Sequence, residues 1–224
     1  PERFREVEDG DSLVREWPVY DFTLEEVKSL DAGSWFSPEF RDSRVPSLRE
    51  VIELARGRAG IYPETKSPEV YASLGFSMER LLVTELERHG LDRRGADPLT
   101  PVVVQSFSAA SLRILRWELK SDLPLTLLVH PGNADEWTKG SGLERLSEFA
   151  SGIGPFKNLV EEDPAMVERA HAVGLSVTPW TFGSQSTSGH IELRAEMARY
   201  VCVLGVDGLF TNNPDLFPRR ESCE

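Results

Sequence analysis

The chain has 224 residues, enough for one sizeable hydrophobic core and too few for two ordinary domains. Its 37 acidic residues outnumber 25 lysines and arginines, and the resulting net charge of −12 argues against binding to nucleic acid or anionic membranes. At 40% hydrophobic and 28% charged residues the composition is that of a globular domain, and no apolar run reaches the roughly 18 residues that a membrane span needs.

Two helix starts stand out in the first quarter of the chain. The first twenty residues are charged and lack helical periodicity. Thr23 with Glu26, and Ser47 with Glu50, then have the spacing of a capping box, in which each side chain accepts the other residue's backbone N–H. Apolar residues with helical spacing follow the second box: Leu48, Val51, Ile52 and Ala55. We expect a helix after each box.

Strand-like and helical segments alternate from residue 59 onward. The predicted strands are residues 59–66, 101–107, 125–130, 152–155, 175–181 and 206–211. The predicted helices are residues 76–90, 109–119, 143–150, 164–173 and 191–203, and Gly174 stands where a C-cap glycine belongs. Such alternation predicts an α/β fold with parallel strands joined by helical crossovers.

Two architectures fit this alternation: an open doubly wound sheet and a closed TIM (β/α)8 barrel. No Gly-x-Gly-x-x-Gly follows any strand, so the dinucleotide-binding fingerprint is absent. Size and strand count favour the barrel, which typically needs about 250 residues. With about six of eight units visible, we expect residues 1–224 to be a single barrel domain that lacks its N-terminal strands. A first residue Pro1 in place of methionine fits a processed chain or a fragment.

The most informative pair of side chains ends the first predicted strand. Glu64 and Lys66 are two residues apart, so on a strand they share one face. One interpretation is a structural ion pair, because an acid or a base buried alone would be costly. The other is a carboxylate that ligates a hard divalent cation beside a lysine that holds an anionic substrate.

Further candidates end other predicted strands, where both architectures place an active site. Gln105 interrupts a run of valines, Lys157 follows residues 152–155, and Trp180 lies near the end of residues 175–181. Each has a structural alternative: a loop anchor, a solvated surface lysine and a packed core aromatic. His130 is the histidine that ends a strand, and no Gly-x-Ser-x-Gly occurs, so acid–base chemistry has one modest candidate.

The cysteines point to no scaffold or zinc site. Cys202 lies in an apolar run and is most simply a core residue, whereas Cys223 lies in a polar tail. The sequence allows one disulfide between them without requiring it, and such a bond would suggest an oxidising compartment. No Cys-x-x-Cys or His-x-x-His spacing suggests zinc.

Taken in order, the motifs resemble those of the glycerophosphodiester phosphodiesterases from about Trp17 to Pro218. Ile61-Tyr-Pro-Glu-Thr-Lys66 is similar to the family's Ile-Glu-Ile-Lys strand, in the form used by its longer branch. The other matching segments are residues 18–33, 45–51, 105–107, 152–157, 170–175, 179–181 and 205–211. Each of these motifs is weak alone, but their order along the chain makes the resemblance specific.

The resemblance implies a TIM barrel that hydrolyses glycerophosphodiesters to glycerol 3-phosphate and an alcohol with one divalent cation, Mg²⁺ or Ca²⁺. It implies that Glu64 is a metal ligand and that Lys66 contacts the phosphate in catalysis. The pocket-lining residues that it implies are Gln105, Phe107, Lys157 and Trp180. The substrate would be a small molecule, and the oligomeric state is left open.

The chain also departs from the family's pattern. In the family, the His-Arg-Gly, Glu-x-Asp and His-Asp motifs carry the acid–base histidines and most metal ligands, and they precede the segment that matches Trp17. None of them stands ahead of Trp17 in this chain. The resemblance therefore implies that the 224-residue chain alone is inactive. A milder departure is Thr211-Asn212, where the family often has Thr-Asp.

Two other functions stay open. One is a phospholipase D-like enzyme acting on lysolipids or sphingomyelin, for which Trp35 and Phe36 could supply an apolar groove from the loop of residues 31–36. The other is a catalytically dead barrel used for binding or scaffolding. Because the longer branch of the family is often exported, the resemblance favours a periplasmic or extracellular location over the cytoplasm.

Overall fold

The structure is a computed structural model, and it describes residues 3–9, 12–183, 189–218 and 223. It divides into two compact units, Pro1–Leu54 and Ala55–Glu224. The first unit opens with an antiparallel hairpin of β1 (Arg5–Asp9) and β2 (Ser12–Glu16), which the sequence did not predict. It continues with α1 (Leu24–Ser29), a 3-10 turn at Pro38–Phe40, and α2 (Leu48–Ala55), which reaches the boundary.

Both capping boxes are confirmed in the first unit. The Glu26 backbone N–H donates to Thr23 Oγ1 at 3.2 Å, and the Thr23 N–H donates to Glu26 Oε2 at 2.8 Å. The Ser47 N–H likewise donates to Glu50 Oε2 at 2.8 Å, and the Glu50 N–H donates back to Ser47 Oγ at 3.4 Å. These bonds satisfy donors that the first turn of a helix leaves free, so α1 and α2 begin where the sequence predicts.

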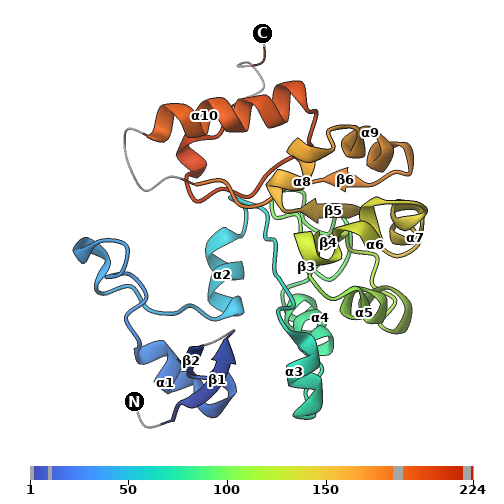
Figure 1. The fold of residues 1–224 in the computed structure, drawn as a ribbon. Helices are drawn as coiled ribbons and strands as arrows, with labels where there is room; N and C mark the ends of the chain where they lie inside the picture. The colour runs from blue at the N-terminus through green and yellow to red at the C-terminus, as the bar shows by residue number, and fades with distance from the viewer. Residues whose placement is uncertain (1–2, 10–11, 184–188, 219–222, 224) are drawn as a thin grey trace. The chain divides into compact units, whose positions relative to one another are not determined.

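The second unit is built on a parallel sheet (Figure 1). Its strands lie in the order β3 (Val104–Ser106), β4 (Leu125–Val129), β5 (Gly152–Pro155) and β6 (Ser176–Val177). Extended backbone continues the sheet at both edges: Glu64 pairs in parallel with Gln105 on one side, and Phe182 with Thr211 on the other. The six parallel segments therefore follow one another in the predicted order; closure into an eight-unit barrel stays a prediction.

The two edge segments and β6 are less regular than the sequence predicts. Residues 59–66 pair with their neighbour only at isolated positions, and residues 206–211 do the same. Proline explains part of this, since Pro63 and Pro179 have no N–H to donate to a ladder. The Gln105 N–H still donates to the Pro63 carbonyl at 2.9 Å, so the first edge keeps its register.

Helices connect the parallel segments. The predicted ones are α4 (Met78–Arg88), α5 (Ala109–Arg113), α7 (Gly142–Ser147), α9 (Ala165–Ala172) and α10 (His190–Ala198). Those not predicted are α3 (Pro68–Ser73), α6 (Ala134–Thr138) and α8 (Lys157–Glu162). π-Helical turns at Ile114–Glu118 and Arg199–Val203 extend α5 and α10. Figure 1 shows α5, α6, α7 and α9 along one side of the sheet.

Gly174 caps α9 as predicted. It has a φ of +79°, and its N–H donates to the His171 carbonyl at 2.9 Å. The Leu175 N–H donates to the Ala170 carbonyl at 2.9 Å, which completes a Schellman motif. A side chain at this position would be strained, because only glycine adopts the left-handed conformation at little cost.

The core of the second unit lies on both faces of β4, whose five residues are all buried. Leu125, Leu127 and Val129 alternate with Thr126, because successive strand residues point to opposite faces. The Thr126 hydroxyl lies 2.6 Å from the Tyr62 hydroxyl. The ring of Tyr62 also packs edge-on against Phe210, with ring centroids 5.1 Å apart, so one tyrosine links the first, third and last segments of the sheet.

The two cysteines form a disulfide, with Cα atoms 5.3 Å apart. The sequence allowed this disulfide but did not require it. Cys202 is only partly buried, so its assignment as a core residue is wrong: the bridge holds it near the surface with the exposed Cys223. Within the described part of the chain, no helix is both long and apolar enough to cross a membrane.

Candidate active site

Glu64 and Gln105 are the centre of the candidate site. They are paired residues on neighbouring parallel segments, so their side chains extend from the same face of the sheet. Oε1 of each side chain is buried, and neither oxygen has a hydrogen-bond partner among the described residues. Buried polar atoms are almost always paired, and two orphaned acceptors on adjacent residues indicate a place built to receive a cation or a hydrogen-bond donor.

Local hydrogen bonds fix the backbone that carries these two side chains. The Thr65 N–H donates to the Gln105 carbonyl at 3.0 Å, and the Ser106 hydroxyl donates to the Thr65 carbonyl at 2.7 Å. Thr65 Oγ1 in turn lies 2.9 Å from Ser111 Oγ of α5. All three polar side chains are buried, so the end of this strand pair is tied to the helix behind it.

A pocket of about 370 Å³ opens beside this strand pair. Two predicted residues line it, Lys66 and Phe107. It also includes Glu69 and Ser108, which sequence reasoning missed, and His130, which it noted only as a strand-ending histidine. The Lys66 side chain is exposed, and an ammonium group at the mouth of a pocket attracts anions. The structure therefore brings Lys66 and Phe107 together at one pocket, and their roles in substrate binding stay predictions.

His130 has a defined hydrogen-bond arrangement. Its ring Nδ1 accepts the Gly132 backbone N–H at 3.0 Å, and the backbone N–H of His130 donates to Asn133 Oδ1 at 3.0 Å. Since Nδ1 is the acceptor, the neutral ring carries its proton on Nε2. The ring centroid lies 6.2 Å from that of Phe107. His130 can thus offer an N–H donor beside the pocket.

Aromatic rings form a wall of which Phe107 lines the pocket. Trp180 stacks edge-to-face on Phe107 with centroids 5.4 Å apart, and on Phe156 with centroids 5.2 Å apart. Its indole N–H donates to the Gly154 carbonyl at 2.7 Å, which fixes the ring. Two predicted residues, Trp180 and Phe107, are therefore in contact, and Phe156 is an addition that the sequence did not indicate.

The backbone of Lys157 is hydrogen-bonded to this aromatic wall, but its ammonium group is paired with Glu196. Its N–H donates to the Trp180 carbonyl at 2.8 Å. Its ammonium group lies 2.6 Å from Glu196 Oε1 of α10 and 5.1 Å from the centroid of the Phe182 ring. A substrate anion would have to compete with Glu196 for this lysine, so its part in substrate binding stays a prediction.

The described residues supply only part of a metal-binding shell. Among them there is no group of three or more His, Cys, Asp or Glu side chains arranged to hold a metal ion. The available donors are the two unpaired oxygens, Oε1 of Glu64 and Oε1 of Gln105. Both are hard oxygen ligands of the kind that Mg²⁺ and Ca²⁺ prefer, so these residues fit one side of such a site.

Trp35 and Phe36 lie in the first unit. Their side chains are 79% and 70% exposed, and the two rings contact each other at 5.8 Å. Phe36 also contacts Phe40, at 5.7 Å between centroids. They form an exposed aromatic cluster within that unit, as expected for a loop with two prominent aromatics.

Comparison with known proteins gives a consistent result. A glycerophosphodiester phosphodiesterase of Bacillus subtilis (strain 168) is 36% identical over 208 residues, covering 89% of this chain and 64% of that protein. The chain thus spans less than two thirds of that relative's length. A glycerophosphodiester phosphodiesterase of Caldanaerobacter subterraneus subsp. tengcongensis is 30% identical over 199 residues, which cover 88% of this chain and 70% of that protein.

The fold is also found among solved structures. An Oleispira antarctica phosphodiesterase, solved in complex with the product sn-glycerol-3-phosphate, superposes with a TM-score of 0.66 at 23% identity, covering 95% of this chain and 72% of that one. The model of the glycerophosphoryl diester phosphodiesterase family matches residues 2–216. This chain therefore belongs to the glycerophosphoryl diester phosphodiesterase family.

Proposed function

We propose that the complete protein hydrolyses glycerophosphodiesters to glycerol 3-phosphate and an alcohol, assisted by one divalent cation, Mg²⁺ or Ca²⁺. The observation that carries this proposal is the pair of buried, unpaired oxygens on Glu64 and Gln105. Family membership supports it, as does the sn-glycerol-3-phosphate bound to the Oleispira antarctica phosphodiesterase.

Each residue of the site has a distinct part in this proposal. Glu64 would hold the cation, which when bound supplies positive charge to the phosphoryl oxygens. Lys66 attracts the phosphate into the pocket, which matters because the chain as a whole has a net charge of −12 and repels anions. Gln105 donates or accepts hydrogen bonds, and Phe107 and Trp180 provide the apolar wall against which a glycerol backbone packs.

His130 contributes one proton-carrying group. With its proton on Nε2 it can donate a hydrogen bond to a phosphoryl oxygen. Hydrolysis of a phosphodiester also needs a base, and His130 is the one histidine that the described residues place in this pocket. We therefore expect the 224-residue chain by itself to be inactive and the complete protein to be active.

The decisive assay measures glycerol 3-phosphate released from glycerophosphocholine by the complete protein, with and without a chelator. Glu64→Ala should abolish metal-dependent release, and activity within a few-fold of wild type would remove Glu64 from the metal site. Lysophosphatidylcholine, tested in parallel, separates the phospholipase D-like alternative. Turnover of neither substrate would favour a binding or scaffolding role.

A further inference from the structure

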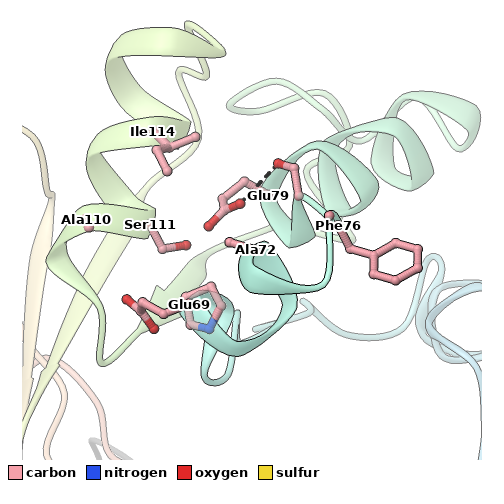
Figure 2. A pocket seen from close by; sticks show the side chains of 10 residues that line it. Glu69, Ala72, Phe76, Glu79, Ala110, Ser111 and Ile114 are labelled. Carbon is pink, nitrogen blue, oxygen red and sulfur yellow. Dashed lines mark hydrogen bonds between the residues drawn. The ribbon is translucent and has the colours of Figure 1, made fainter. Parts of the chain in front are cut away.

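A second pocket lies in the same unit, among helices and next to the pocket at Lys66, with which it shares Pro68 and Glu69. It has a volume of about 360 Å³ and is lined by α3, the start of α4, and α5. Its apolar side chains include those of Ala72, Ala110 and Ile114. Figure 2 shows the side chain of Phe76 turned outward, whereas Glu79 and Ser111 approach each other across the pocket.

Glu79 is the unusual residue of this pocket. It is only 5% exposed, yet it is a carboxylate on the first turn of α4. The Ser77 hydroxyl donates to its Oε2 at 3.1 Å. No ion pair involves Glu79 among the described residues, and no lysine, arginine or histidine lines the pocket. A buried carboxylate normally has a cationic partner, so this pocket lacks a counter-charge.

The helix itself supplies only part of that counter-charge. A carboxylate at a helix N-terminus is favoured by the helix dipole, which is equivalent to about half an elementary charge. A full negative charge therefore remains under-compensated, and Glu69 adds a second one. Glu69 also lines the pocket and accepts a hydrogen bond from the Ser108 hydroxyl. The pocket combines apolar walls with negative charge and has no positive group of its own.

This combination selects a class of ligand. An inorganic divalent cation would need several oxygen ligands, and the described residues hold no group of three acidic, histidine or cysteine side chains suited to one. An organic ammonium ion instead pairs its charge with one carboxylate and packs its carbon atoms against apolar walls. The neighbouring pocket at Lys66 has the opposite preference, because its exposed lysine attracts anions.

We propose that this pocket binds a small organic cation with an ammonium centre, and that Glu79 is its counter-ion. The site is separate from the proposed hydrolytic one, although Pro68 and Glu69 line both pockets. It does not depend on the hydrolytic reaction, since no residue placed in that chemistry contributes its charge.

The test is a calorimetric titration of the complete protein with choline, whose trimethylammonium group matches this class. We expect one saturable site per chain. Glu79→Gln keeps the shape of the side chain and removes its charge, and should weaken binding by about 30-fold or more, as for other buried charge pairs that lose one member. 3,3-Dimethylbutan-1-ol, the neutral carbon analogue of choline, should bind far more weakly than choline.

Matched variants locate the bound cation. Glu144→Gln removes an exposed carboxylate on α7 and should leave choline affinity unchanged. Glu64→Gln should also leave it unchanged, which separates this pocket from the proposed metal site. If Glu79→Gln does not fold by circular dichroism, Ala110→Leu, which fills the pocket, takes its place. No saturation by about 10 mM choline, or equal affinity in wild type and the pocket variants, would overturn the proposal.

Discussion

Replacing Glu64 by glutamine should stabilise the metal-free protein while removing its response to metal. The substitution keeps the length and shape of the side chain but removes a charge whose Oε1 is buried without a partner. It also places an amide donor on the residue paired with Gln105, whose own Oε1 is unpaired. An orphaned polar group that costs stability and is nevertheless present indicates a functional site, where stability is given up for activity.

The size of the effect follows from the orphaned atoms. An unsatisfied buried polar group costs about 1–3 kcal/mol. Recovering part of that should raise the free energy of unfolding by about 1–2 kcal/mol. For a protein of this size each kcal/mol corresponds to about 2–4 °C in Tm. Glu64→Gln should therefore melt about 2–8 °C above wild type in the presence of a chelator.

Differential scanning fluorimetry with EDTA, and then with excess Mg²⁺ or Ca²⁺, measures both parts of this prediction. A ligand at 100 times its Kd stabilises the folded state by about 2.7 kcal/mol, so wild type should gain several degrees and the variant almost none. Glu144→Gln is the exposed control and should change the free energy of unfolding by less than about 0.5 kcal/mol. A Glu64→Gln variant that melts below wild type in EDTA would refute the reasoning, because the carboxylate would then be structural.

Three further outcomes follow from other parts of the molecule. Arg116 donates hydrogen bonds to the carbonyls of Phe149 at 3.0 Å, Leu123 at 2.9 Å and Ser121. Arg116→Ala should therefore lower the free energy of unfolding by about 3 kcal/mol, and a loss below about 1 kcal/mol in urea denaturation would contradict this. Hydrogen bonds from Ser34 and Gly33 lower the pKa of Asp31 to about 2. The contribution of Asp31 to folding stability should therefore be complete above its unfolded-state pKa near 4 and be lost as the pH falls through about 2. A midpoint near 4 in an NMR titration of the Asp31 carboxyl would contradict this. Reducing the disulfide, which joins cysteines 21 residues apart, should lower stability by up to about 3 kcal/mol, and an unchanged urea midpoint would oppose this.

Local patterns allowed much of the fold to be predicted. The capping boxes at Thr23 and Ser47 act within one helical turn, so the residues that decide the helix starts are adjacent in the sequence. The parallel direction of these segments could be predicted from alternation, because a crossover helix returns the chain to the end of the sheet where the previous strand began. Their sequential order required the further choice of a barrel over a doubly wound sheet.

The features that sequence reasoning missed depend on short or distant interactions. Helices α3, α6 and α8 have five or six residues, too few to show a helical period. In the first hairpin, Val7 faces Val14 and Glu6 faces Arg15. The stabilising contacts there are cross-strand pairs, which a scan for helical periodicity does not detect.

The candidate site likewise combines contacts that the sequence predicts with contacts that depend on distant packing. That Glu64 and Gln105 would meet could be expected, because they end neighbouring strands. The ion pair between Lys157 and Glu196 could not be expected, because the two residues are 39 positions apart and meet only once α10 packs beside α8. The disulfide likewise joins Cys202 to a tail residue by proximity in space.

The most direct test of the central claim is the rate of glycerol 3-phosphate release from glycerophosphocholine by the complete protein and by its Glu64→Gln variant, at saturating Mg²⁺ or Ca²⁺. If Glu64 and Lys66 belong to a metal-assisted phosphodiesterase site, wild type releases glycerol 3-phosphate, and the variant loses at least about 100-fold in rate, comparable with the loss of one strong electrostatic contact to a transition state. Equal rates in wild type and variant would contradict the account.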